Sequence, residues 1–244
     1  FRRETLVQAD GSLLPGVPLV SGSVIRGQLR RTAAEMTHGV IAEITGSERQ
    51  PFQVVHALRT GGSLRERRAG EEPISGNRQA ELRSLLPMLG LFGASVGTRI
   101  MAGRLVVDKG LPVSTETQHL ADYYGVDLDG YNAPTIWRLV QRETYARHAD
   151  VTTGEINSYI SLDEDVELPR GGGQMQWSHE TLPMGTRLFH ALHVAAATPV
   201  EQSFMMDLVS QWSRDARIGG QIARGMGRVS TDYTLSVTDV TGTD

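Results

Sequence analysis

The chain has 244 residues, of which 39% are hydrophobic and 21% are charged, and these proportions exclude an intrinsically disordered protein. No run approaches ~18 consecutive apolar residues, so we expect no membrane-spanning helix, and the absence of cysteine excludes a disulfide framework, a thiolate zinc site and a cysteine nucleophile. The formal net charge of −4 argues against a uniformly basic nucleic-acid-binding protein, and a cysteine-free chain fits a cytoplasmic location.

The first half of the chain predicts a strand over residues 3–8, followed by turns at Asp10-Gly11 and Pro15-Gly16. Apolar residues at helical spacing predict a helix over residues 23–38, with Ser21 or Ser23 as its N-cap. Residues 39–78 are mixed in character and rich in glycine, and we expect a loop-rich insertion there. A short helix over residues 79–89, broken near Pro87, and a buried strand over residues 105–107 complete this half.

The second half contains a polar, turn-rich stretch over residues 143–182, which we interpret as a second insertion, and then a strand over residues 188–195. The clearest helix follows, because Thr198 and Glu201 have the spacing of a capping box and Pro199 occupies the first helical position. Its inner face holds Val200, Phe204, Leu208 and Trp212. A final strand alternates from residue 229 to residue 237. Together these elements predict an α+β fold with an antiparallel sheet covered by helices.

Arginine supplies 23 of the 24 basic residues, and its positions are uneven. Three stretches concentrate it, namely residues 24–31, 59–68 and 214–228, whereas residues 163–167 read Asp-Glu-Asp-Val-Glu. Arginine binds phosphate in a bidentate manner, so a slightly acidic protein with segregated charge can still present a basic surface. Codon bias explains the ratio of arginine to lysine but not these positions.

Two segments are candidates for binding phosphate. In the first, a Gly/Ser turn at residues 21–23 leads into a helix with Arg26 and Arg30 on one face, and helix N-termini attract anions. In the second, residues 218–229 carry four glycines and two arginines between a helix and a strand, where bare backbone amides can form an anion-binding nest. The alternatives are a capped helix with a solvated basic face and an ordinary glycine-rich connection.

The two segments together resemble the repeat-associated (RAMP) proteins of CRISPR systems. The shared blocks are Ser-Gly-Ser-x-x-x-Gly-x-x-Arg from residue 21, Leu91-Phe92-Gly93 with Gly103-Arg104-Leu105 and Asp108, residues 179–186, and the glycine-rich segment. Their order over residues 18–230 is most similar to the backbone subunit of class 1 effector complexes, with type IV as the suggested type. The first strand of that family is longer than the residues before Ser21 allow, so we expect that an N-terminal segment is missing.

The resemblance implies a ferredoxin-like, RNA-recognition-type palm with finger and thumb insertions in a single domain. The palm core then comprises residues 1–38, 91–142 and 183–244, the finger residues 39–90, and the thumb residues 143–182. It also implies a non-catalytic subunit that binds guide RNA through its sugar–phosphate backbone, forms a helical homo-oligomer along it and joins other effector subunits. Neither a cofactor nor a metal is implied.

The RNA-binding residues implied by the resemblance fall into two groups in this sequence. The helix start contributes Ser21, Ser23, Arg26 and Arg30, and the glycine-rich segment contributes Gly219, Gly220, Arg224, Gly225, Gly227 and Arg228. We add His148 and Trp177, which flank or lie in the thumb insertion. A solvated His148 and a buried Trp177 are the alternatives for these two.

Two further functions remain open at this stage. A RAMP-family ribonuclease would slice target RNA with an aspartate before the first helix, or process guide RNA, but Asp10 is the only candidate aspartate and lies in what looks like a plain turn. A ferredoxin-like interaction protein without RNA is the other possibility. His190 and His193 are three apart in a predicted strand and therefore face opposite sides, which is poor zinc geometry.

Overall fold

The computed structural model describes residues 1–62, 75–96, 99–147 and 175–238, and it has the mixed helix and strand content of the predicted α+β class. It divides into two compact units, each of which is considered by itself. The helical unit is built mainly from residues 19–111 and 189–244. The hairpin unit is built mainly from residues 3–18 and 112–188.

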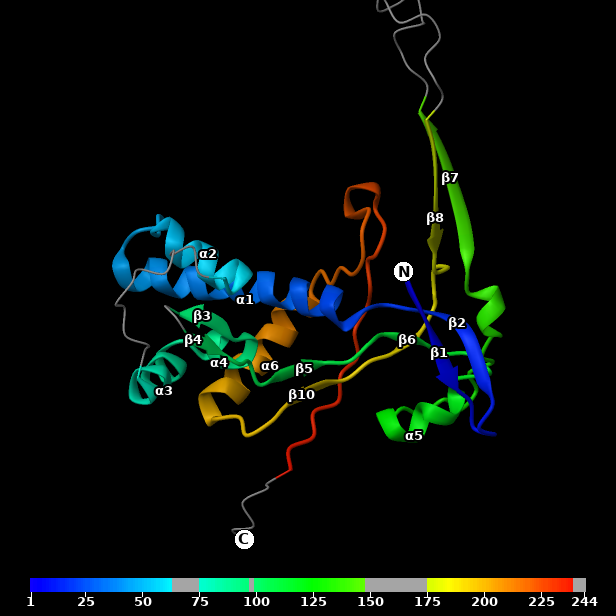
Figure 1. Cartoon of the computed structure of the whole chain (residues 1–244), viewed down its shortest axis with the longest axis horizontal. Coiled ribbons are helices and arrows are strands. Elements are labelled where there is room, and N and C mark those ends of the chain that lie inside the picture. Colours follow the sequence, from blue (N-terminus) through cyan, green and yellow to red (C-terminus); the bar gives the residue numbers. More distant parts are fainter. Residues whose placement is uncertain (63–74, 97–98, 148–174, 239–244) are drawn as a thin grey trace, which may run out of the picture. The chain divides into compact units, whose positions relative to one another are not determined.

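The helical unit contains five α-helices, one 3₁₀ helix and four short strands among its described residues (Figure 1). The helices are α1 (Gly22–Thr45), α2 (Phe52–Thr60), α3 (Gly76–Leu85), α4 (Pro87–Phe92), α6 (Pro199–Ser213) and the 3₁₀ helix η5 (Ile222–Arg224). The strands are β3 (Ala94–Val96), β4 (Arg99–Met101), β5 (Leu105–Val107) and β10 (Leu192–Val194). β3 pairs antiparallel with β4, and β5 with β10.

Helix α1 begins at the predicted place, where the Ser21 side chain accepts a hydrogen bond from the Ser23 N–H. Its buried face includes Ile25, Leu29 and Ala33, which belong to one hydrophobic cluster with residues of α4 and α6. The helix continues through residues 39–45 and stops at the left-handed Gly46, and α2 follows. The prediction of a loop-rich segment is therefore wrong for residues 39–45 and 52–60, which are helical, because only one glycine interrupts the helix-compatible run before Gly46.

Glycine permits a close approach at the start of α1. A Cβ at Gly22 would clash with the main-chain carbonyls of Val107 and Asp108, so the first turn of the helix packs directly on the end of β5. The carbonyl and N–H of Val20 also bridge to Gly110 in an antiparallel pair, at 2.8 and 2.9 Å. The first turn of α1 is therefore fixed to the strand by backbone contacts.

The capping box of α6 is confirmed, because the Thr198 hydroxyl accepts from the Glu201 N–H and the Glu201 carboxylate accepts from the Thr198 N–H. Leu208 and Trp212 are buried as predicted, whereas Val200 on the same predicted face is exposed. Residues 229–238 show the expected alternation in burial only as far as Tyr233, and they form no strand.

The hairpin unit contains most of two strand pairs and three short helices. The strands are β1 (Arg2–Val7), β2 (Leu13–Leu19), β7 (Gln141–Arg147) and β8 (Met175–Thr181), and the helices are η1 (Gln118–Leu120), α5 (Ala121–Tyr124) and η2 (Ile136–Arg138). The predicted turn at Pro15-Gly16 lies inside β2, where Gly16 takes a positive φ of 75°. β6 (Leu111–Pro112) and β9 (Leu188–Phe189) lie where the chain passes between the units.

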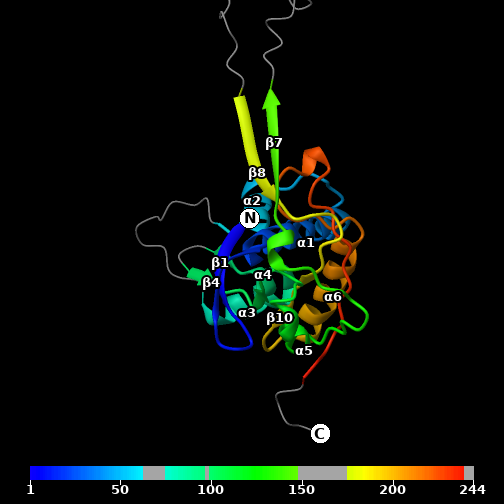
Figure 2. The same cartoon turned by 90° about the vertical axis from the view of Figure 1, so that its right-hand side faces the viewer.

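Figure 2 shows β7 and β8 as a long two-stranded ribbon. The strands are antiparallel, and their register places Glu143 opposite His179 and Tyr145 opposite Trp177. Arg3 of β1 forms an ion pair of 2.6 Å with Glu180 of β8 and donates to the Gly16 carbonyl of β2 at 2.8 Å. This arginine therefore ties the two strand pairs of the hairpin unit together.

Every sheet in the described part of the chain is two-stranded, so the expected continuous antiparallel sheet is absent there. The predicted strand over residues 188–195 is divided into β9 and β10 at His190, whose ring turns to the Tyr233 hydroxyl at 2.7 Å. Across those same described ranges, no helix has the length and apolar character needed to cross a membrane.

Candidate nucleic-acid interface

The start of α1 presents hydroxyl groups and backbone amides, as the sequence predicts. The Ser21 side chain accepts from the Ser23 N–H at 3.3 Å, and its carbonyl accepts from the Val24 N–H at 3.0 Å. Capping therefore uses the Ser21 oxygen, while the exposed Ser23 side chain is placed to donate to a ligand. The role of either serine in binding RNA stays a prediction.

Arg26 and Arg30 lie on one face of α1, but their guanidinium groups bind main-chain carbonyls. Arg26 donates to the carbonyls of Leu105 and Phe92, the latter at 2.9 Å. Arg30 donates to four carbonyls at 3.0–3.3 Å, namely those of Ala57, Leu58, Phe92 and Gly93. The two side chains therefore connect α1 to the end of α2, the end of α4 and the start of β5.

Partial burial lowers the pKa of both arginines from its ordinary value, and for Arg30 the charge of Arg26 lowers it further. Both groups remain charged at neutral pH, because arginine starts so far above it. A phosphate would have to compete with carbonyls for their N–H donors. Phosphate binding by this pair consequently stays a prediction, and their observed contacts are structural.

The glycine loop, residues 218–229, leaves the end of α6 and returns to it as a narrow hairpin. The Ile218 N–H donates to the Gly227 carbonyl at 2.9 Å, and the Val229 N–H donates to the Ala216 carbonyl at 3.0 Å. Arg217 and Arg228 face each other in an isolated antiparallel bridge. A Cβ at Gly227 would clash with the Ile218 carbonyl, so this position requires glycine for the close approach.

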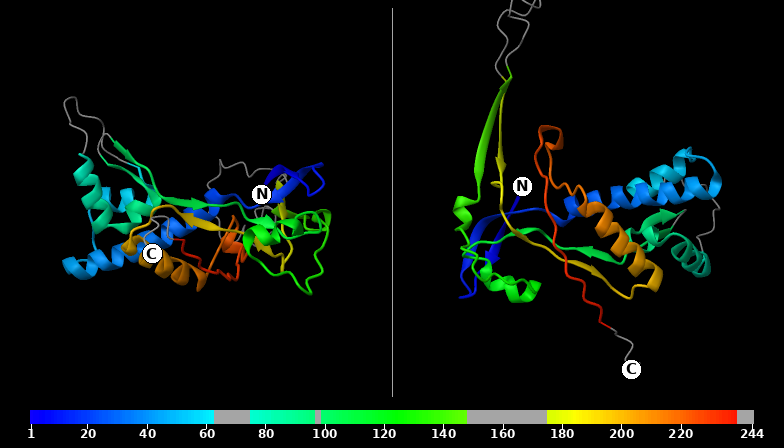
Figure 3. Two further views of the ribbon diagram at one scale, coloured as in Figure 1. Left: turned by 90° about the horizontal axis from the view of Figure 1, so that it is seen from below. Right: turned by 180° about the vertical axis from the view of Figure 1, so that it is seen from behind.

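The tip of the glycine loop is exposed main chain in unusual conformations. Gly219, Gln221 and Gly225 all have positive φ, between 61° and 81°, on either side of η5. Positive-φ turns of this kind occur in anion-binding nests, but the N–H groups of Arg224, Gly225 and Met226 donate to the carbonyls of Gln221 and Ile222 within the loop. Figure 3 shows the orange tip standing away from the helices, and Arg224 lies exposed on it.

The base of the glycine loop concentrates charge. The Asp215 carboxylate lies 3.2 Å from the Arg217 guanidinium and 3.8 Å from that of Arg228. Arg228 is largely exposed, so these ion pairs are weak and leave its donors accessible to a ligand. One acid between two arginines leaves the base with a net positive charge.

The two segments that are distant in sequence belong to the same unit and share its core. Ile218 and Val229 of the glycine loop pack against the cluster that contains Ile25 and Leu29 of α1. The contacts of Arg26, however, run to β5 and α4. The loop and the helix start therefore contribute to one hydrophobic core, and the exposed arginines belong mainly to the loop.

The ribbon of β7 and β8 carries an aromatic face that the sequence analysis recognised only in part. Tyr145 and His179 stack with ring centroids 5.0 Å apart and ring planes 11° from parallel. Trp177, opposite Tyr145, is 40% exposed. Tyr145 was missed, although strand alternation over residues 143–147 and 175–181 places it on the face of Trp177. His148 lies outside the described residues.

Asp10, the one candidate for metal-dependent cleavage, forms the turn between β1 and β2. Its carboxylate accepts from the hydroxyl of Ser12 at 2.7 Å and from the main-chain N–H of Ser12 at 2.9 Å, and these bonds lower its pKa. His193 pairs with Asp108 at 3.3 Å, whereas His190 binds Tyr233. Within the described ranges, no cluster of three acidic or histidine side chains suits a metal ion.

The chain is similar to known proteins in sequence and in structure. Residues 12–230 match the RAMP superfamily. The chain is similar to one in a solved structure titled "Type IV-B CRISPR Complex", with 26% sequence identity and a TM-score of 0.59, over 99% of this chain and 85% of that one. A search of the curated proteins found no match. Because the match extends over most of its length, the chain belongs to the RAMP superfamily.

Proposed function

We propose that this protein is a non-catalytic backbone subunit of a class 1 CRISPR effector complex, of type IV, and that it binds guide RNA in the cytoplasm. Its family and its similarity to a chain of a type IV-B complex support this role. The observation that supports RNA binding is the exposed glycine loop, in which positive-φ backbone and the exposed Arg224 and Arg228 side chains occur together. Several copies of the protein would line one RNA, together with other effector subunits.

The chemistry of the glycine loop suits phosphate better than bases. Backbone amides and arginines recognise phosphate oxygens without reading sequence, which a subunit that accepts any guide requires. Gly219, Gly220 and Gly225 would allow the sugar–phosphate backbone to approach the main chain closely, because a Cβ is absent there. Arg224 and Arg228 would add charge, while Ser21 and Ser23 would add donors at the neighbouring helix start.

The ferredoxin-like palm, finger and thumb belong to the same proposal. The pair β5–β10 with α1 and α6 would be the centre of the palm, α2 and α3 would lie in the finger, and β7 and β8 would form the base of the thumb. An exposed Trp177 beside a stacked Tyr145–His179 pair supports a thumb that meets unstacked bases.

The test is RNA binding by the full chain at several salt concentrations, with two RNA oligonucleotides of unrelated sequence. We expect Arg224→Ala to weaken both equally and to reduce the slope of log affinity against log salt by about 0.7, one phosphate contact on a single strand. Arg49→Ala removes the same charge from an exposed position between α1 and α2, and should leave binding unchanged. Equal RNA binding by Arg224→Ala and the unaltered chain would contradict the role of the loop.

Cleavage assays decide between this role and the ribonuclease alternative. Metal-dependent cleavage of bound RNA that disappears in Asp10→Ala would replace the backbone role with target slicing. Metal-independent cleavage that depends on a histidine would replace it with guide processing. Intact RNA after prolonged incubation with the unaltered chain and divalent metal agrees with the proposal.

A further inference from the structure

The end of α6 carries an acid where helix chemistry does not favour one. Asp215 follows the C-cap residue Arg214, and its N–H donates to the Trp212 carbonyl at 3.3 Å. The C-terminal end of a helix has a partial negative charge, so a base is favourable there and an acid is not. The Asp215 side chain is also 64% exposed, so it fills no space in the core. The stability of α6 therefore does not explain this acid.

The partners of Asp215 are the two arginines at the base of the glycine loop. The Arg217 guanidinium lies 3.2 Å from the Oδ1 oxygen of Asp215 through both Nε and Nη2. The Nε atom of Arg228 lies 3.8 Å from the same oxygen, which is beyond hydrogen-bond length. All these contacts fall on one carboxylate oxygen, whereas the strongest arginine pairs use two. The carboxylate is therefore held loosely enough to be displaced.

The two arginines need a negative group between them. Arg217 and Arg228 face each other across the isolated antiparallel bridge that closes the loop. Like charges directly opposite one another destabilise a pair of strands. In the free chain Asp215 supplies the negative charge that offsets this repulsion.

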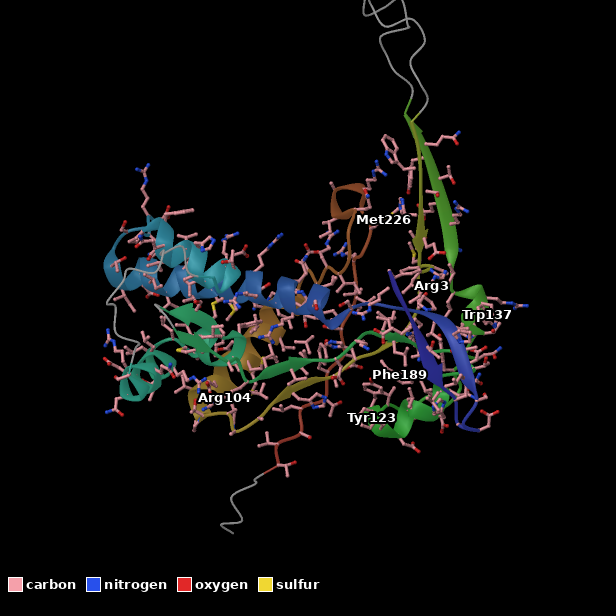
Figure 4. All side chains as sticks on the ribbon, in the orientation of Figure 1. Arg3, Arg104, Tyr123, Trp137, Phe189 and Met226 are labelled. Carbon is pink, nitrogen blue, oxygen red and sulfur yellow. The ribbon has the colours of Figure 1, made fainter. Side chains whose placement is uncertain are left out.

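A phosphodiester matches this position better than the carboxylate does. It carries one negative charge, as Asp215 does, so an exchange leaves the net charge of the base unchanged. Its two free oxygens can accept from Arg217 and Arg228 separately, and arginine forms such bonds readily with phosphate. Arg228 is 72% exposed, so a ligand reaches it from solvent. Figure 4 labels Met226 in the outer part of this loop, shortly before Arg228.

We propose that Arg217 and Arg228 form a phosphate site that Asp215 occupies in the free protein, and that an RNA phosphate displaces Asp215 on binding. The proposal rests on the proposed function and adds Arg217 to its RNA contacts. The displaced carboxylate turns into water, which changes its surroundings little because it is already largely exposed. Asp215 is then an internal competitor that lowers the affinity of one copy for RNA.

The first experiment tests the site without RNA, by titrating inorganic phosphate into the full chain labelled with ¹⁵N and following the arginine Nε–H signals by NMR. We expect Asp215→Asn to bind phosphate several-fold more tightly than the unaltered chain, with the signals of Arg217 and Arg228 shifting together. Substitution of each arginine by lysine assigns its signal. Asp215→Ser also removes the charge and should behave in the same way.

Asp207→Asn is the matched control for this charge change. Asp207 is exposed on α6. It lies about two turns, or roughly 12 Å, before Asp215, which exceeds the Debye length of about 10 Å at 0.1 M salt. The control should therefore titrate as the unaltered chain does. Equal phosphate affinity of Asp215→Asn and Asp207→Asn, with both folded by circular dichroism, overturns the proposal.

The second experiment measures binding of a short single-stranded RNA at several salt concentrations. We expect Asp215→Asn to bind several-fold more tightly at low salt and to steepen the slope of log affinity against log salt by about 0.7, because the base then has one more net positive charge. Arg217→Gln should change affinity and slope in the opposite direction. An RNA affinity of Asp215→Asn equal to that of Asp207→Asn overturns the exchange of Asp215 for phosphate.

These outcomes are distinct from a failure of the proposed function. If Asp215→Asn binds inorganic phosphate more tightly but neither it nor the unaltered chain binds RNA, the phosphate site stands and the proposed function is contradicted. If the unaltered chain binds RNA and Asp215→Asn binds RNA and inorganic phosphate no better, the role of Asp215 alone is contradicted.

Discussion

Arg26 donates a hydrogen bond to the main-chain carbonyl of Phe92 at 2.9 Å, and its guanidinium carbon lies 5.3 Å from the centroid of the Phe92 ring. Arg30 binds the same carbonyl at 3.3 Å and lies 5.7 Å from the same ring centroid. Two arginines one helical turn apart therefore hold the end of α4 against α1. The sequence block Leu91-Phe92-Gly93 and the helix start are parts of one structural contact.

We expect Arg30→Ala to lower the free energy of unfolding by about 2 kcal/mol, because it leaves partly buried carbonyls at the end of α2 and after α4 without donors. Urea denaturation followed by circular dichroism measures this. Arg30→Lys should recover little, since one ammonium cannot match the four bonds of a planar guanidinium. Arg31→Ala, at an exposed position on the same helix, should change stability by less than about 0.5 kcal/mol.

The same variants separate a structural role from RNA binding. If Arg30→Ala retains the stability of the unaltered chain but loses affinity for RNA, the carbonyl contacts are unimportant and the side chain is a phosphate ligand. If it loses stability while the folded fraction still binds RNA normally, the arginine pair is structural and phosphate contacts belong to the glycine loop.

Gly227→Ala tests whether RNA binding depends on the closed base of the glycine loop. The added Cβ would clash with the Ile218 carbonyl and open the hairpin. Gly46→Ala is the matched control, because Gly46 at the end of α1 also has a positive φ, of 66°, but open space around the position of a Cβ, and it is not among the RNA-binding candidates. We expect both to show the cost of a left-handed alanine, roughly 1 kcal/mol, and only Gly227→Ala to lower RNA affinity several-fold in a filter-binding assay.

A comparable loss of RNA affinity in Gly46→Ala and Gly227→Ala would contradict this expectation. It would mean that a general loss of stability, rather than the closed base of the loop, lowers the affinity. Unchanged affinity in both would show that RNA binding does not depend on the base of the loop.

Trp177→Ala tests the aromatic face of the hairpin unit. Stacking of one base on an aromatic ring contributes about 1–3 kcal/mol, so we expect a loss of affinity of about tenfold for single-stranded RNA. Trp137→Ala removes an equally large exposed ring from η2 of the same unit and should have no effect. Quenching of tryptophan fluorescence on adding RNA, lost in Trp177→Ala and retained in Trp137→Ala, reports the contact directly. The opposite pattern of quenching would assign the RNA contact to η2.

Local signals predicted the elements that local chemistry determines. The Ser21 cap, the capping box of Thr198 and Glu201, and the break at Pro87 all depend on residues within one or two turns, and the structure contains each of them. The charge pattern also located the glycine loop. What the sequence did not disclose is the partner of each arginine, because the carbonyls of Phe92 and Leu105 lie more than sixty residues from Arg26.

The prediction of a final strand over residues 229–237 failed for a related reason. Alternation over residues 229–237 predicts which side chains face inward, and Val229 and Tyr233 do pack against the core. It does not determine whether another strand lies alongside to accept hydrogen bonds, and the structure assigns none there. In the same way, the aromatic face of β7 and β8 depends on the register between two strands that residues 148–174 separate in the sequence, which a pattern within one strand cannot give.

The carboxylate of Glu116 makes the stability of the hairpin unit depend on pH. Burial alone would raise its pKa, but hydrogen bonds from the Ile136 N–H at 3.0 Å and the Thr135 hydroxyl at 2.8 Å, with Ser114 contributing, lower the pKa to about 2. Because the folded pKa lies below the ordinary value of 4.5, ionised Glu116 stabilises the folded state above about pH 4.5. This contribution is lost as pH falls from there toward 2.

We therefore expect Glu116→Gln to reduce the free energy of unfolding at pH 6 and to flatten its decline between pH 4.5 and pH 2, measured by urea denaturation at each pH. Thr135→Val removes one donor and keeps the carboxylate, so its profile should lie between those of Glu116→Gln and the unaltered chain. Since the introduced amide can still accept from the Ile136 N–H but carries no charge, any pH dependence that remains in Glu116→Gln belongs to other carboxylates. A decline as steep in Glu116→Gln as in the unaltered chain would show that Glu116 does not control acid stability.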